Sequence, residues 1–158
     1  MRTVEVGVYK FAELPDYAKE RARQWWREGQ DYPWWKDSFG SIEDFCNEFR
    51  VKIRDYQIGA YSPSYMATDA ENHHFRGLKL KDYPRDKNPT GYCLDCTLWE
   101  TFHDIWKESG DPLRAFNEAI DKAVKDIVSD MEYLDSDEAV DEMLIVNDYE
   151  FDEDGRLF

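Results

Sequence analysis

The sequence lacks the long apolar runs of a membrane protein. No stretch approaches the 18 consecutive apolar residues that a transmembrane helix needs. The amino-terminal residues contain no apolar segment typical of a signal peptide. Cysteine is scarce as well: Cys46, Cys93 and Cys96 make an odd number, which argues against a framework of paired disulfides. These absences predict a cytoplasmic protein in a reducing compartment.

The signatures of common catalytic and nucleotide-binding sites are also missing. The chain has no P-loop, no G-x-G-x-x-G motif and no G-x-S-x-G elbow, and it contains only three histidines. Carboxylates are so numerous that no single pair stands out as an acid–base couple. We therefore expect a protein that is not an enzyme and that needs no cofactor.

Basic residues are absent from a stretch of thirty residues near the carboxyl end. Residues 126–155 hold thirteen acids and no Lys or Arg, whereas the whole chain has 35 acids, 20 bases and a net charge of −15. Nucleic-acid-binding proteins neutralise phosphates with Lys and Arg, so this balance argues against direct nucleic-acid binding. It favours a basic partner instead.

Hydrophobic periodicity predicts five helices. The clearest stripe steps by four, three, four and three through Trp35, Phe39, Ile42, Cys46 and Phe49. Local signals set the helix ends, such as an aspartate cap followed by proline at Asp111-Pro112, and an Asp135-x-x-Glu138 capping box. The predicted helices cover residues 15–28, 34–49, 92–108 and 112–134, with a short fifth from the capping box to about residue 147.

Alternating apolar residues predict strands in the first and middle parts of the chain. An opening strand is expected over residues 3–11, a meander over 51–61, 63–68 and 75–80, and a hairpin that Asp154-Gly155 closes near the carboxyl end. Together these elements predict an α+β protein: one compact domain over residues 1–158, with a small, mostly antiparallel sheet packed with about five helices.

Two groups of residues invite a metal interpretation. Glu150, Asp152 and Asp154 precede Gly155 with the spacing of a calcium loop, but the bidentate acid at its twelfth position would fall three residues past Phe158. A hairpin turn is the simpler interpretation, and no metal is expected.

The second group is Cys93-x-x-Cys96 with His103. On a straight helix Cys96 and His103 lie about 10 Å apart along the axis, too far to share one ion. We favour buried, small apolar side chains for the cysteines. A metal or redox protein built on Cys93, Cys96 and a histidine is retained as an alternative.

Four tryptophans crowd into the stretch "QWWREGQDYPWW". Helical spacing assigns Trp25, Trp26 and Trp35 to core stripes. Trp34 lies off the stripe of its helix, so we expect this ring at the surface, where an aromatic side chain can anchor an interface.

The acidic carboxyl-terminal segment has two interpretations. Like charges three or four residues apart on a helix cost stability, which makes a crowded acidic face unusual unless something positive binds it. The segment is therefore either a solvated helix face or a surface for a basic partner. The acids that we expect to contact such a partner are Asp135, Asp137, Glu138, Asp141 and Glu142.

The two ends of the chain resemble those of small acidic proteins common in bacteriophage and prophage genomes. "YKFAELPDYAKERARQWW" resembles a strand followed by an F-x-E-L-x-x-x-A-K-x-x-A helix, and "NDYEFDEDGRLF" resembles an N-x-Y-E-F-x-x-D-G-x-L ending. Pro15 stands where such proteins often have a capping serine. The resemblance covers about thirty residues and implies an origin in a mobile element; some members of the group are labelled antitoxin-like.

Charge and resemblance together imply a phage-encoded, non-enzymatic inhibitor of a host defence complex, of anti-CRISPR or anti-restriction type, acting in the cytoplasm of the infected cell. Its carboxylates would mimic nucleic-acid phosphates on a basic host protein or nucleoprotein complex. An antitoxin-like protein that neutralises one cognate toxin is the alternative. No membrane partner is expected, and a homodimer is left open.

Overall fold

The computed structural model describes all 158 residues and divides them into two compact units. Unit 1 contains residues 1–32 and 132–158, and unit 2 contains residues 33–131. The chain forms five α-helices and two antiparallel two-stranded sheets, so the predicted α+β class is confirmed. The prediction of one domain over residues 1–158 stays a prediction.

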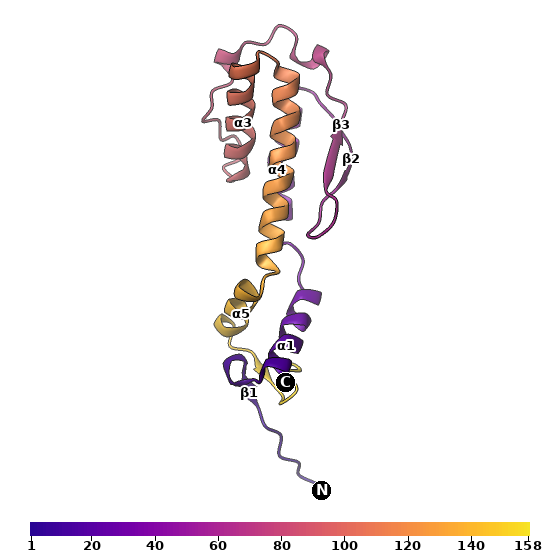
Figure 1. Cartoon of the computed structure of the whole chain (residues 1–158), viewed down its shortest axis with the longest axis vertical. Coiled ribbons are helices and arrows are strands. Elements are labelled where there is room, and N and C mark those ends of the chain that lie inside the picture. The colour runs from indigo at the N-terminus through magenta and orange to yellow at the C-terminus, as the bar shows by residue number, and fades with distance from the viewer. The chain divides into compact units, whose positions relative to one another are not determined.

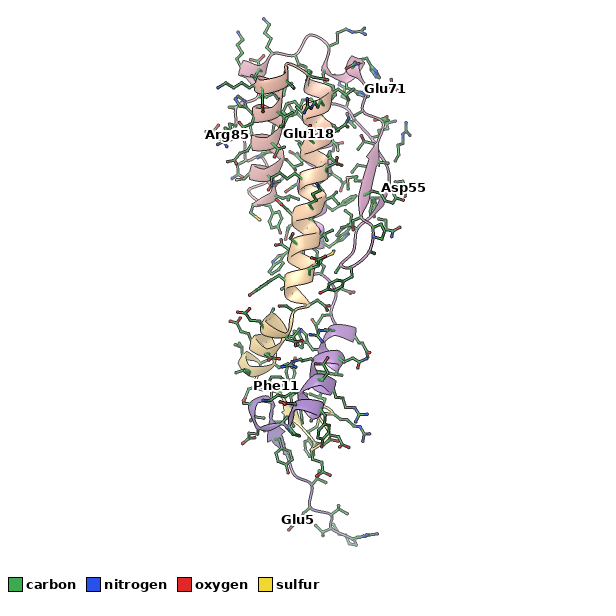
Figure 2. The ribbon with its side chains drawn as sticks, in the orientation of Figure 1. Glu5, Phe11, Asp55, Glu71, Arg85 and Glu118 are labelled. Atoms are coloured by element: carbon green, nitrogen blue, oxygen red, sulfur yellow. The ribbon has the colours of Figure 1, made fainter.

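Unit 1 joins the two ends of the chain. Strands β1 (Tyr9–Lys10) and β4 (Glu150–Phe151) pair antiparallel, with Tyr9 opposite Phe151, and helices α1 (Asp16–Glu28) and α5 (Asp137–Val146) lie side by side (Figure 1). Figure 2 shows Phe11, in the 3-10 turn after β1, within this unit. The core consists of seven buried side chains: Phe11, Leu14, Ala18, Ala22, Val140, Leu144 and Phe151.

The carboxyl-terminal hairpin forms as predicted. Phe151 bridges Leu157 in antiparallel fashion, and Gly155 takes a positive φ of 80° at the turn. Asp152 Oδ1 accepts the backbone N–H groups of Asp154 at 3.0 Å and Arg156 at 2.9 Å. The Asp152 carboxylate therefore closes the turn by an aspartate–backbone hydrogen-bond pattern.

Unit 2 is built around aromatic side chains. Phe45 stacks on Phe116 with ring centroids 5.0 Å apart, and Trp99 and Phe102 meet Phe45 edge-on. Asp111 Oδ1 accepts the N–H groups of Leu113 and Arg114, as its predicted role as a cap requires. The elements of this unit are α2 (Trp35–Glu48), β2 (Ile53–Gln57), β3 (Tyr65–Thr68), α3 (Leu94–Ser109) and α4 (Pro112–Leu134), whose last three residues belong to unit 1.

The prediction of one small sheet is wrong, because the four strands form two separate pairs, β1 with β4 and β2 with β3. The opening strand is also shorter than predicted, since β4 offers only two residues for pairing. Val4, Val6 and Val8 precede it and are 68%, 56% and 40% exposed, and Figure 2 labels Glu5 in this extended segment.

Residues 75–80 do not form the predicted third strand of the meander. Two short 3-10 helices, Asn72–Phe75 and Leu80–Asp82, occupy this region instead, and Gly77 between them has a φ of +78°. A residue in this left-handed region cannot continue a strand. Phe75 is buried against Phe49 and Phe116, so its apolar character serves the aromatic core rather than a sheet.

Two local predictions in unit 1 are wrong. Ser136, not Asp135, caps α5: its Oγ accepts the N–H of Ala139 at 3.3 Å, which makes the predicted capping box incorrect. Trp25, which helical spacing assigned to a core stripe, is 36% exposed, so the buried stripe of α1 is formed by Ala18 and Ala22. Small side chains let the backbone of α1 approach the carboxyl-terminal turn closely.

We predict that Gly155→Ala destabilises unit 1 by at least about 2 kcal/mol. The positive φ alone disfavours alanine, and the added Cβ would also overlap the backbone carbonyl of Ala18. Gly77→Ala is the matched control: its φ is +78°, but a Cβ there meets nothing within 4 Å. Urea denaturation should show a clearly smaller loss for the control, and equal losses would contradict the proposed clash.

Candidate functional site

Two arginines of α1 bind acids of α5. Arg23 holds Asp141 through two hydrogen bonds, Nε to Oδ1 at 2.6 Å and Nη2 to Oδ2 at 2.8 Å. Arg27, one turn further along α1, donates from Nη2 to Asp137 Oδ1 at 2.5 Å. Asp137 and Asp141 are likewise one turn apart on α5. The two helices thus match a pair of bases with a pair of acids. We call Arg23, Arg27, Asp137 and Asp141 the arginine ladder.

Asp135 joins the arginine ladder through its backbone. Arg27 Nε donates to the Asp135 carbonyl oxygen at 2.9 Å and lies 3.7 Å from its carboxylate. On α1 itself, Glu20 contacts both Arg23 and Arg27 at 3.2 and 3.3 Å. Three of the five acids predicted to meet a partner, Asp135, Asp137 and Asp141, therefore contact arginines of their own chain.

The arginine ladder shifts the pKa values of its members. The hydrogen bonds that Arg23 donates to Asp141 raise the pKa of Arg23 above its usual value. Burial lowers the pKa of Arg27, but the hydrogen bond and charge of Asp137 outweigh that effect, so the net shift is upward. The hydrogen bond from Arg27 lowers the pKa of Asp137. These directions mean that the charged forms are stabilised in the folded unit.

A second ion-pair cluster joins β1 to β4. Lys10 Nζ lies 3.0 Å from a carboxylate oxygen of Asp148 and 3.1 Å from one of Glu150. Hydrogen bonds to these two acids raise the pKa of Lys10. Two further acids of the carboxyl-terminal segment are thus matched by a base from the other end of the chain.

Glu138 and Glu142 remain without an ion pair. They lie four residues apart on α5, both are exposed, and neither contacts a basic side chain. The same exposed side of the helix continues through Ile145 and Val146, which are 56% and 72% exposed. We call these four residues the α5 stripe. It combines two unmatched acids with two exposed apolar side chains, the composition of a small docking surface.

The apolar end of the α5 stripe was not predicted. The signal for it was the run "MLIV" at residues 143–146, four apolar residues in succession on a helix that can bury only one face. Leu144 is completely buried, whereas Met143, Ile145 and Val146 are exposed.

Trp34 is 44% exposed, as expected for a ring off the stripe of its helix. It precedes α2 and belongs to unit 2, whereas the five predicted acids belong to unit 1. A partner-binding role for Trp34 and for the acids stays a prediction.

The interpretation of all three cysteines as buried apolar side chains holds for Cys46 alone. Cys46 is 1% exposed, and burial is the main cause that raises its pKa to about 12. Cys93 and Cys96 are exposed, because they lie off the face of α3 that packs into the core through Leu94, Leu98 and Phe102. His103 Nδ1 lies 2.8 Å from the backbone oxygen of Tyr83, and the His, Cys, Asp and Glu side chains nowhere form a group of three or more that could hold a metal ion.

No family model, curated protein or solved structure matches the chain. The resemblance to phage proteins therefore stays a prediction. None of the helices is both long enough and apolar enough to cross a membrane.

We predict that Arg27→Leu lowers the melting temperature of unit 1 at pH 7 by several degrees and flattens its acid dependence. Asp137 has a lowered pKa in the folded unit, so its stabilising contribution is present above the ordinary aspartate pKa near 4 and is lost as the pH falls through the lower, folded value. Arg27 is the main cause of this lowered pKa, and the charge of Arg23 contributes less, so the variant loses most of the difference. Thermal unfolding followed between about pH 7 and pH 2 measures both effects.

Arg21→Leu is the control for this experiment, because Arg21 is exposed on the same helix and has no ion pair. It should leave the acid dependence of unit 1 unchanged. Parallel curves for Arg27→Leu and the wild-type protein would show that the arginine ladder contributes nothing to stability.

Proposed function

We propose that the protein is a phage-encoded, non-enzymatic inhibitor of a host defence complex, of anti-CRISPR or anti-restriction type. It acts by occupying a basic surface on which that complex holds nucleic acid. The observation that carries the proposal is the α5 stripe, where Glu138 and Glu142 are exposed and lack an ion pair. Exposed carboxylates can form ion pairs with arginine and lysine side chains that otherwise bind phosphates.

The overall charge of unit 1 supports such a partner. This unit holds seventeen acids and seven bases. The bases of the arginine ladder and of the Lys10 cluster are already among those seven, so unit 1 keeps an excess of ten acids, seventeen minus seven. The electrostatic field of this net negative charge attracts a basic protein over long range. It raises the rate of association and makes that rate sensitive to salt.

Ile145 and Val146 supply the apolar contact that charged side chains alone cannot provide. Exposed ion pairs contribute little to affinity, whereas apolar side chains at the centre of an interface contribute by leaving water. On the α5 stripe the two kinds of side chain are adjacent along one helix. In the proposed complex the glutamates orient the partner and the apolar end anchors it.

The test uses a double variant, Glu138→Gln with Glu142→Gln. The matched control is Glu43→Gln with Asp44→Asn, which removes the same two charges from exposed positions of α2 in unit 2. Each protein is expressed in cells that carry an active CRISPR or restriction system, and phage plating is counted. We expect the wild-type protein and the control to restore plating, and the α5 variant to lose at least tenfold of that effect.

Binding of the purified defence complex should follow the same order and should weaken as salt rises. Equal losses in the two double variants would show that total charge, and not the α5 stripe, is responsible. Unchanged plating with the wild-type protein, together with rescue of cells from a co-expressed toxin, would replace the proposal with the antitoxin-like alternative.

A further inference from the structure

The exposed cysteines form a close pair at the start of α3. Cys93 immediately precedes the helix, and the N–H of Cys96 donates to the Cys93 carbonyl oxygen at 3.1 Å. Helical geometry places Cα atoms three residues apart at about 5 Å. That separation lies within the range that a disulfide bond spans. The two thiols are therefore near enough to bond without a large movement of the backbone.

The backbone that carries the two thiols is firmly held. Leu94 and Asp95, which lie between them, are 5% and 0% exposed. Asp95 Oδ2 accepts the N–H groups of Thr90 at 2.9 Å and Gly91 at 3.1 Å, and also the Thr90 hydroxyl at 2.8 Å. The residues between the cysteines are thus fixed to the core and to the preceding loop, while both cysteines remain accessible to solvent.

Cys46 provides an internal contrast. It lies on α2, is 1% exposed and contributes to the core. Reaction of a thiol requires access and the thiolate form, and burial denies Cys46 both. The chain therefore keeps one protected thiol apart from an accessible pair.

We propose that Cys93 and Cys96 form a thiol–disulfide exchange site that takes small disulfides of the glutathione type. In the first step the thiolate of one cysteine attacks the small disulfide, which forms a mixed disulfide and releases one small thiol. In the second step the other cysteine attacks the protein sulfur of that mixed disulfide and releases the second small thiol. The protein dithiol loses two electrons and two protons, and the small disulfide gains them.

This inference does not depend on the proposed function. The cysteines belong to unit 2 and the α5 stripe to unit 1. Loss of thiol exchange in a cysteine variant that still restores phage plating would leave the proposed inhibitor intact, and the reverse result would leave the exchange site intact.

The first experiment counts reactive thiols with a chromogenic disulfide reagent on the folded, full-length protein. We expect two of the three cysteines to react rapidly and the third only after denaturation. Oxidised glutathione is then added, and the intact mass is measured. The wild-type protein should lose two hydrogen atoms and two of its three free thiols, and it should retain no glutathione.

Single variants separate the two exchange steps. Cys93→Ser and Cys96→Ser should each retain one bound glutathione, because the second attack is no longer available. Cys46→Ser is the matched control and should close its disulfide as the wild-type protein does. If that variant fails to fold, peptide mapping of the oxidised wild-type protein locates the bond instead.

A neutral small disulfide serves as a second probe, since the acidic chain repels the anionic glutathione molecule. We expect it to give the same internal bond. Glutathione or the neutral probe remaining attached to the wild-type protein, with no bond between Cys93 and Cys96, would overturn the proposal. Oxidation that requires denaturant would overturn it as well.

Discussion

The stability of α5 and the surface charge of unit 1 both depend on the pairing of α1 arginines with α5 acids. Without Arg23 and Arg27, α5 would present its acids with no opposing charge, and like charges on neighbouring turns cost helix stability. The two arginines carry side chains only 18% and 22% exposed, so they need acceptors for their buried N–H groups. The arginines of α1 thus neutralise acids of α5, and those acids accept the N–H groups of the arginines. The acids of α5 without an arginine partner remain available at the surface of unit 1.

Elements set by local chemistry could be predicted from the sequence. The helix at residues 35–48 follows from apolar spacing, Asp111 caps a helix because its side chain reaches N–H groups two and three residues ahead, and Gly155 turns the chain because it tolerates a positive φ. The partner of a strand is not local. Alternation in residues 3–11 was read as a full strand, but the pairing ends where β4 ends, about 140 residues later.

The candidate site shows the same limit. The sequence predicted all five acids as partner contacts but could not show which of them pair with bases of the same chain. The bases that match Asp137 and Asp141 lie 110 and 118 residues earlier. Burial of Cys93 and Cys96 was predicted from residue type, although the apolar stripe of their own helix already excluded it. Leu94, Leu98 and Phe102 step by four, which leaves Cys96 on another side of α3.

The arginine ladder also determines which acids of α5 a basic partner can contact. A cation that competed for Asp141 would have to break a two-bond guanidinium–carboxylate contact. The largely shielded Arg23 would keep only its single contacts with Glu20 and Asp137, which is costly. Glu138 and Glu142 can be contacted without such a loss. Salt also screens exposed charges more strongly than shielded ones. As ionic strength rises, contacts made through the α5 stripe should therefore weaken before the arginine ladder does, so that unit 1 stays folded under conditions in which the partner is released.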